Sequence, residues 1–191
     1  MNNLRQIGLA TQTYMNDNDG VLFTATTRWT SLLNPKYVAA WGLFQSPFDT
    51  RAPSETGTTA PVSPISYGLN FNSVGITADR ISKPTVFILF APAQASGPTV
   101  SFQGTALDPV APGVRVLGIG GTTANTATST PGGNATGGSQ NNRNRINALF
   151  ADLHAETMPW TTFTNDAATA SDPDGQYRWN PVPTPSPAPT P

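Results

Sequence analysis

The chain has 191 residues, only 11% of them charged, and its formal net charge is −1. This balance argues against a nucleic-acid-binding protein, whose affinity would come from a surplus of Lys and Arg. The lack of cysteine excludes disulfides and thiolate chemistry, and the single histidine, His154, argues against a zinc enzyme. Because 37% of the residues are hydrophobic, the chain can form a core, and its length fits one domain.

Residues 2–17 have the periodicity of an amphipathic helix. Four residues at spacings of three and four form its core-facing stripe: Leu4, Ile7, Thr11 and Tyr14. The run N-D-N-D-G at 16–20 ends the helix and offers Gly20 for a left-handed backbone position. Because no capping residue precedes the helix, we expect it to be the lower half of a longer helix.

The rest of the chain predicts mostly strands. Residues 21–63 read as irregular, with a short helix at 37–44 and Pro35 in its first turn. Strands are expected at 65–70, 85–91, 100–102, 114–119 and 146–151, with 155–158 returning as a hairpin partner. Of these, the most apolar is 85–91, the predicted central strand, and we expect Val86, Ile88, Phe90, Leu149 and Phe150 in or near the core. The predicted fold class is α+β, with the helix packed on an antiparallel sheet.

Two segments have low-complexity sequences. Residues 118–144 are mainly Gly, Thr, Asn and Ser, which predicts a long surface loop, and Asn134 begins an N-glycosylation sequon within it. Residues 181–191, P-V-P-T-P-S-P-A-P-T-P, favour an extended polyproline II segment. We therefore expect a globular domain over 1–180 and a Pro-rich tail after it.

Few residues suggest chemistry. Asp152 and His154 are two apart, which suits either an acid–base pair or an ordinary turn Asp beside a partly exposed His at a hairpin end. Asp166, Asp172 and Asp174 form an acidic stretch whose oxygens suit Ca²⁺ or ordinary turns. Four tryptophans suit either core packing or a platform for stacking sugars. These are Trp29, Trp41, Trp160 and Trp179.

Six short motifs follow one another between residues 2 and 160. They are N-N-L-R-Q-I-G-L-A at 2–10, W-T-S-L-L at 29–33, F-Q-S-P-F-D at 44–49, S-Y-G-L-N at 66–70, I-S-K-P at 81–84 with I-L-F-A at 88–91, and N-A-L-F-A-D-L-H-A at 147–155. In this order they resemble the globular part of bacterial type IV pilin-like proteins and type II secretion G-type pseudopilins, which are made with a prepilin-type cleavage and methylation segment.

The sequence departs from that family in three places. The apolar first half of the long helix is absent, so we expect a native N-terminus about 25–30 residues upstream, enough for one membrane span. Ser46 replaces the usual Cys, and Leu153 replaces the Gly of the D-G-H turn. Because Gly serves a positive φ in such turns, we expect this turn to have another geometry.

The resemblance implies a non-catalytic structural subunit of a cell-surface or extracellular filament, either a type IV pilus-like fibre or a secretion pseudopilus. It implies self-assembly into a homopolymer through the N-terminal helix, with other pilins or pseudopilins as further partners and membrane contact only before assembly. No cofactor is expected, apart from the Ca²⁺ alternative. The alternatives from the residues alone are a secreted carbohydrate-binding module using Trp160 or Trp179, and an enzyme built on Asp152 and His154.

Overall fold

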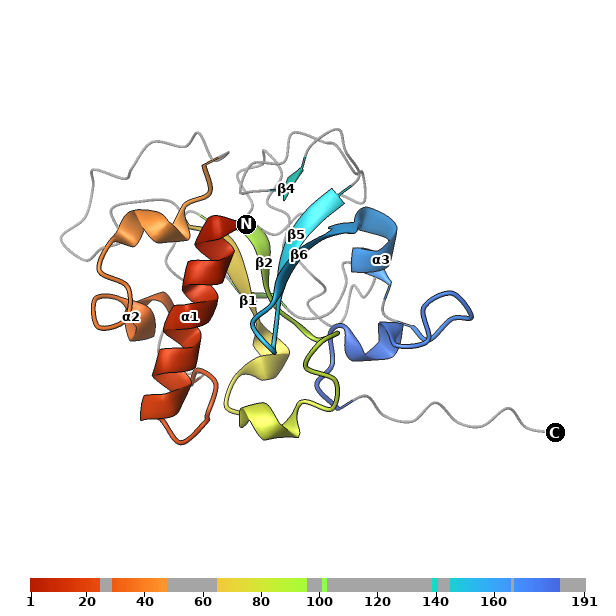
Figure 1. The fold of residues 1–191 in the computed structure, drawn as a ribbon, viewed down its shortest axis with the longest axis horizontal. Coiled ribbons are helices and arrows are strands. Elements are labelled where there is room, and N and C mark those ends of the chain that lie inside the picture. The colour runs from red at the N-terminus through yellow and green to blue at the C-terminus, as the bar shows by residue number, and fades with distance from the viewer. Residues whose placement is uncertain are drawn as a thin grey trace.

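The computed structural model describes residues 1–24, 29–47, 65–95, 101–102, 139–140, 145–165 and 167–182. The helices within these ranges are α1 (Asn2–Asp17), α2 (Trp29–Leu33) and α3 (Trp160–Thr164). The strands are β1 (Ile65–Asn70), β2 (Ile88–Ala95), β3 (Ser101–Phe102), β4 (Ser139–Gln140), β5 (Arg145–Phe150) and β6 (Ala155–Pro159). Short 3₁₀ turns lie at Trp41–Phe44, Phe71–Ser73, Ala78–Arg80 and Gly175–Tyr177. In Figure 1, α1 and α2 lie to one side of the strands and α3 to the other.

The centre of the sheet is an antiparallel ladder in the order β1-β2-β5-β6, with β4 also antiparallel to β5. The predicted α+β class is therefore compatible with the structure. The prediction of an antiparallel sheet is wrong for one pair, because β3 runs parallel to β1 through the partners Leu69–Ser101 and Asn70–Phe102. That pair joins two segments that a hairpin cannot connect, so no local turn signal marks it.

The predicted first helix is confirmed with the same bounds. Its four stripe residues, Leu4, Ile7, Thr11 and Tyr14, are all buried. After the helix, Gly20 has a φ of 75° and donates its backbone N–H to the Met15 carbonyl at 2.9 Å. The apolar periodicity and the glycine stop therefore identified both the core-facing side and the end of α1.

The prediction of a short helix at 37–44, within an otherwise irregular 21–63, is only partly confirmed. The chain forms α2 before Pro35 and a 3₁₀ turn at Trp41–Phe44, instead of one helix at 37–44 that begins after Pro35. Trp29 and Leu33 are one helical turn apart, and both are buried, which favours a helix there despite its short length. Pro35 follows that helix, and the Asn34–Pro35 peptide bond is cis.

The predicted strands are mostly confirmed, with shifts. β1 has the predicted bounds, β5 and β6 form the predicted hairpin, and β3 begins one residue later than expected. β2 begins at Ile88 instead of Thr85, because Val86 and Phe87 donate their N–H groups to Lys83 in a turn. Val86 is half-buried, while Ile88, Phe90, Leu149 and Phe150 are buried as predicted. Residues 139–140 of the predicted 118–144 loop form β4, and 114–119 lie outside the described residues.

Candidate functional site

The buried side of α1 lies directly against the sheet. Leu4 and Ile7 are fully buried, and the buried Thr11 hydroxyl donates to the Ile7 carbonyl at 2.8 Å. A Cβ added to Gly8 would lie 3.2 Å from a Leu149 methyl carbon, which is closer than most real contacts. Glycine at this position therefore lets α1 approach β5 closely.

The last turn of α1 is held by aromatic and charged neighbours. The Tyr14 ring stacks on Phe23 with centroids 5.0 Å apart, and meets Tyr37 edge-on at 5.8 Å. Burial, and to a lesser degree Tyr37, raises the pKa of Tyr14. The Asp17 carboxylate accepts hydrogen bonds from Lys36 at 2.7 Å and from the Tyr37 hydroxyl at 3.0 Å, and these bonds lower the pKa of Asp17.

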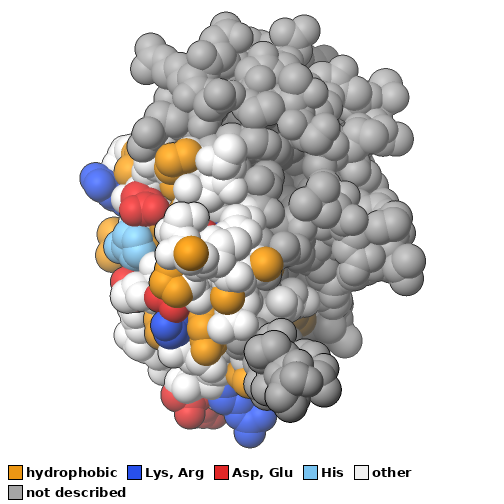
Figure 2. Space-filling model, turned by 90° about the vertical axis from the view of Figure 1, so that its right-hand side faces the viewer, with side chains coloured by type: hydrophobic (Ala, Val, Ile, Leu, Met, Phe, Trp, Pro, Cys, Tyr) orange, Lys and Arg blue, Asp and Glu red, His pale blue; other side chains and the backbone are white. Residues whose placement is uncertain are grey.

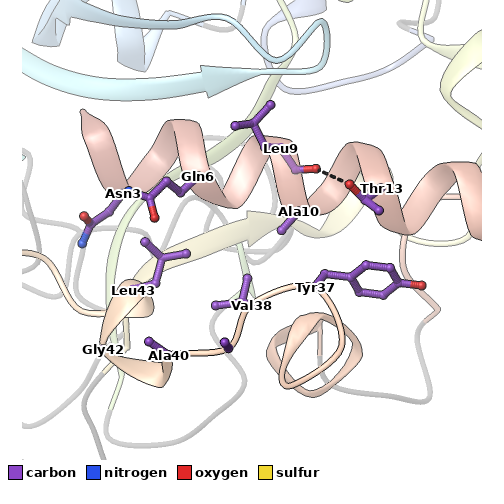
Figure 3. A pocket seen from close by; sticks show the side chains of 11 residues that line it. Asn3, Gln6, Leu9, Ala10, Thr13, Tyr37, Val38, Ala40, Gly42 and Leu43 are labelled. Atoms are coloured by element: carbon purple, nitrogen blue, oxygen red, sulfur yellow. Dashed lines mark hydrogen bonds between the residues drawn. The ribbon is translucent and has the colours of Figure 1, made fainter.

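The outer side of α1 borders a shallow groove of about 650 Å³ (Figure 3). It lies between α1 and residues 37–43. Leu9, on its α1 side, is 68% exposed, which is unusual for a large apolar side chain. None of the described residues that line it is charged; these are Asn3, Gln6, Leu9, Ala10, Thr13, Tyr37, Val38, Ala39, Ala40, Gly42 and Leu43.

Asp152 and His154 do come together at the end of the β5–β6 hairpin. His154 Nδ1 lies 2.5 Å from Asp152 Oδ1, and the same oxygen accepts the His154 backbone N–H at 3.2 Å. The imidazole also stacks on the Phe150 ring, with centroids 4.3 Å apart and planes within 3°. Figure 2 shows this histidine on the surface beside acidic side chains. The two side chains contact each other and the neighbouring Phe150 ring, all within the same hairpin turn. This matches the interpretation as an ordinary hairpin end.

The turn between those two residues keeps a left-handed backbone without glycine. Leu153 has a φ of 70°, so the expectation that leucine would change the turn is wrong in this respect. Backbone hydrogen bonds hold the turn from both sides: Leu153 donates to Phe150, and Phe150 to His154, each at 2.9 Å. Ala151 also donates to the Phe87 carbonyl at 3.0 Å, so contacts with the neighbouring segment fix the conformation.

The carboxylates proposed for Ca²⁺ have other partners. Asp172 forms an ion pair with Arg178 at 2.8 Å and accepts a hydrogen bond from Asn165 at 2.7 Å, while Asp174 pairs with Lys83. Asp166 lies outside the described residues, as does the sequon at Asn134. Within the described ranges, no three His, Cys, Asp or Glu side chains gather as metal ligands would.

The tryptophan platform suggested for sugar binding is contradicted at Trp179. Its side chain is 1% exposed and meets Phe163 edge-on, with centroids 4.9 Å apart. Trp29 is also buried, at the centre of an aromatic cluster with Phe44 and Phe90. Trp29 and Trp179 therefore belong to the core, as the alternative interpretation of core packing predicted. The Trp160 side chain lies outside the described part of the chain.

A polar network that no sequence pattern indicated holds the segment after α3 on the sheet. The buried Asn70 amide donates to the Ile88 carbonyl at 2.9 Å and to the Trp179 carbonyl at 3.2 Å. Asn72 donates to the same Trp179 carbonyl at 2.9 Å, and the Ile88 N–H donates to the Arg178 carbonyl at 2.9 Å. The S-Y-G-L-N motif contains Asn70, but sequence spacing gave no sign that its partner is more than a hundred residues later.

Comparison with known proteins gives no match: no family model, no curated protein and no solved structure is significantly similar to this chain. The resemblance to pilins therefore remains a prediction from the motifs. In the described part of the chain, no helix has the length and apolar character needed to cross a bilayer.

Proposed function

We propose that this protein is a non-catalytic structural subunit of an extracellular or cell-surface filament of the type IV pilus or secretion-pseudopilus kind. The observation that supports the proposal best is the packing of α1. Its buried stripe lies on a sheet that ends in the β5–β6 hairpin. A first helix on an antiparallel sheet is the arrangement that the pilin resemblance implies. Its partners would be further copies of the chain and other pilins or pseudopilins.

The surface composition supports repeated self-contact. The net charge is −1 and only 11% of the residues are charged, so crowded copies meet little like-charge repulsion. A single head-to-tail contact, repeated by a helical operator, is enough to make an open fibre. The outer side of α1 is suited to such a contact because it presents Leu9 and a groove whose described lining residues are uncharged.

The absence of catalysis is part of the same proposal. Asp152 and His154 are the pair on which an enzyme would have been built, and they contact each other and Phe150 at a half-exposed hairpin end. A general base must reach a substrate proton, and it normally lies in a site that positions that substrate. The position of this pair instead favours a role in closing the turn.

The test is electron microscopy of the surface material of the source cells, combined with mass spectrometry of any fibres. We expect fibres that contain this chain, and the subunit mass will show the extent of the mature chain and any glycans. A Gln6→Arg variant, which places a charge on the outer side of α1, should reduce fibre number severalfold. Ser171→Arg, at an exposed loop position, is the matched control. A chain found only as a soluble monomer, with its native N-terminus present, would contradict the proposal.

A further inference from the structure

The groove beside α1 has the features of a binding site for an uncharged, extended peptide. It lies along α1 between Asn3 and Thr13, which corresponds to about 15 Å of helix. The lining combines apolar side chains such as Val38 and Leu43 with the side-chain amide of Gln6 and the ring of Tyr37. Since none of the described lining residues is charged, they offer a charged ligand no ion pair.

The aromatic side chain of this groove is held in position before any ligand binds. The Tyr37 hydroxyl donates to Asp17 at 3.0 Å, and its ring meets Tyr14 edge-on. In Figure 3 the ring lies at one end of the groove, with Leu43 and Val38 farther along it. A fixed ring next to apolar side chains and an amide is the surface that proline-rich segments recognise, because a polyproline II strand loses little entropy when it binds.

This chain itself contains a segment of that kind. Residues 183–191, P-T-P-S-P-A-P-T-P, are uncharged and have proline at every second position. At the polyproline II rise they would span about 28 Å, nearly twice the length of the groove. They follow Val182, which is 66% exposed, so the described chain leads out to solvent where the segment begins.

The segment begins away from the groove of its own copy. Pro181 is held beside the segment that precedes β2, where its carbonyl accepts the Ser82 N–H at 2.9 Å. Figure 1 shows the C-terminal part of the described chain on one side of the strands and α1 with residues 37–43 on the other. This arrangement favours a groove on a neighbouring molecule.

We propose that residues 183–191 of one copy bind in the α1 groove of the next copy. Such a contact is head-to-tail and leaves the assembly with one free groove at one end and one free segment at the other, so further copies can add wherever the rotation does not close a ring. The inference rests on the proposed self-assembly, for which it names the contact. The second copy's tail is the occupant, in preference to an unrelated peptide or a sugar.

The test measures binding of a fluorescent peptide with the sequence of residues 181–191 to the full chain, by anisotropy. We expect saturable binding, and none for a peptide in which the prolines of 183–191 are replaced by alanine. Leu9→Asp and Gly42→Gln should each weaken binding about tenfold or more. Gly42 lines the groove and a Cβ there meets no atom within 4 Å, so a larger side chain should reduce the groove without disturbing the fold.

The matched control is Gln12→Asp, which adds the same charge as Leu9→Asp at an exposed position of α1 that does not line the groove. It should bind the peptide like the wild-type chain, and circular dichroism should show all three variants folded. No binding, or equal binding by the wild-type chain and the groove variants, would overturn the inference. So would a neutral oligosaccharide that binds with the same variant pattern while the peptide does not.

The two proposals fail separately. Fibres that contain this chain, together with no peptide binding, leave the filament function standing and remove the groove contact. Peptide binding that depends on Leu9 and Gly42, in cells that make no fibres, keeps the tail–groove contact as a simple association between copies and removes the filament.

Discussion

Two segments far apart in the sequence pack on the same sheet by different means. Helix α1 is held by apolar contacts, with Leu4 and Ile7 fully buried and Gly8 close to Leu149. The segment after α3 is held by hydrogen bonds from Asn70 and Asn72 to the Trp179 carbonyl, and the ion pair of Asp172 with Arg178 joins two parts of the segment itself. Apolar contacts tolerate small shifts, whereas a polar network loses much of its value when one partner is missing. The two segments should therefore respond differently to single substitutions.

The largest effect is expected on the α1 side. Ile7→Ala should lower the free energy of unfolding by about 3–4 kcal/mol, because it leaves a cavity between α1 and the sheet. Leu9→Ala on the opposite side should change it by less than about 0.5 kcal/mol. Urea denaturation followed by circular dichroism measures both. Similar losses for the two variants would mean that the buried stripe has been assigned wrongly.

Removal of the ion pair should come next. Asp172→Ala leaves the Arg178 guanidinium, which is 4% exposed, without its carboxylate and should cost about 3 kcal/mol. Asp174→Ala removes a half-exposed pair with Lys83 and should cost less than about 1 kcal/mol. Limited proteolysis at residues 165–182 should show faster cleavage for the first variant alone. If both variants resisted cleavage equally, the Asp172–Arg178 ion pair would not stabilise this segment as described.

A smaller loss is expected from Gly175→Ala. The added Cβ would lie 2.2 Å from the Ala167 carbonyl oxygen, so the backbone of this loop must shift. We expect a loss of about 2 kcal/mol. The control is Gly42→Ala, where a Cβ meets no atom within 4 Å. Thermal unfolding monitored by tryptophan fluorescence compares them, and an unchanged midpoint for Gly175→Ala would show that the loop packs less closely than described.

The smallest effect concerns the end of α1. Hydrogen bonds from Lys36 and Tyr37 lower the pKa of Asp17 in the folded protein below its ordinary value of 3.8. As the pH falls, the unfolded chain therefore binds a proton at the Asp17 carboxylate before the folded protein does. The contribution of these hydrogen bonds to the free energy of unfolding is thus complete above the ordinary pKa. It is lost as the pH falls through the lower folded pKa. Asp17→Asn should flatten the acid side of the stability curve there; a curve parallel to the wild type would contradict this.

The same contrast explains what the sequence could predict. The stripe of α1, the bounds of β1 and the β5–β6 hairpin follow from periodicity within short windows. Asn70 and Asn72 could not be placed, because the Trp179 carbonyl to which both donate lies more than a hundred residues later and polar residues carry no periodic signal. For the candidate site, the outer side of α1 followed from its buried side, but residues 37–43 did not, since the helix expected there does not form.

The central claim is that copies of this chain assemble into a fibre through α1, and a cryo-EM map of fibres from the cell surface tests it most directly. We predict that α1 lies in contact with neighbouring subunits and that the hairpin end with His154 faces outward. Fibres built from other proteins, or a map in which the outer side of α1 faces solvent along the whole fibre, would contradict the account.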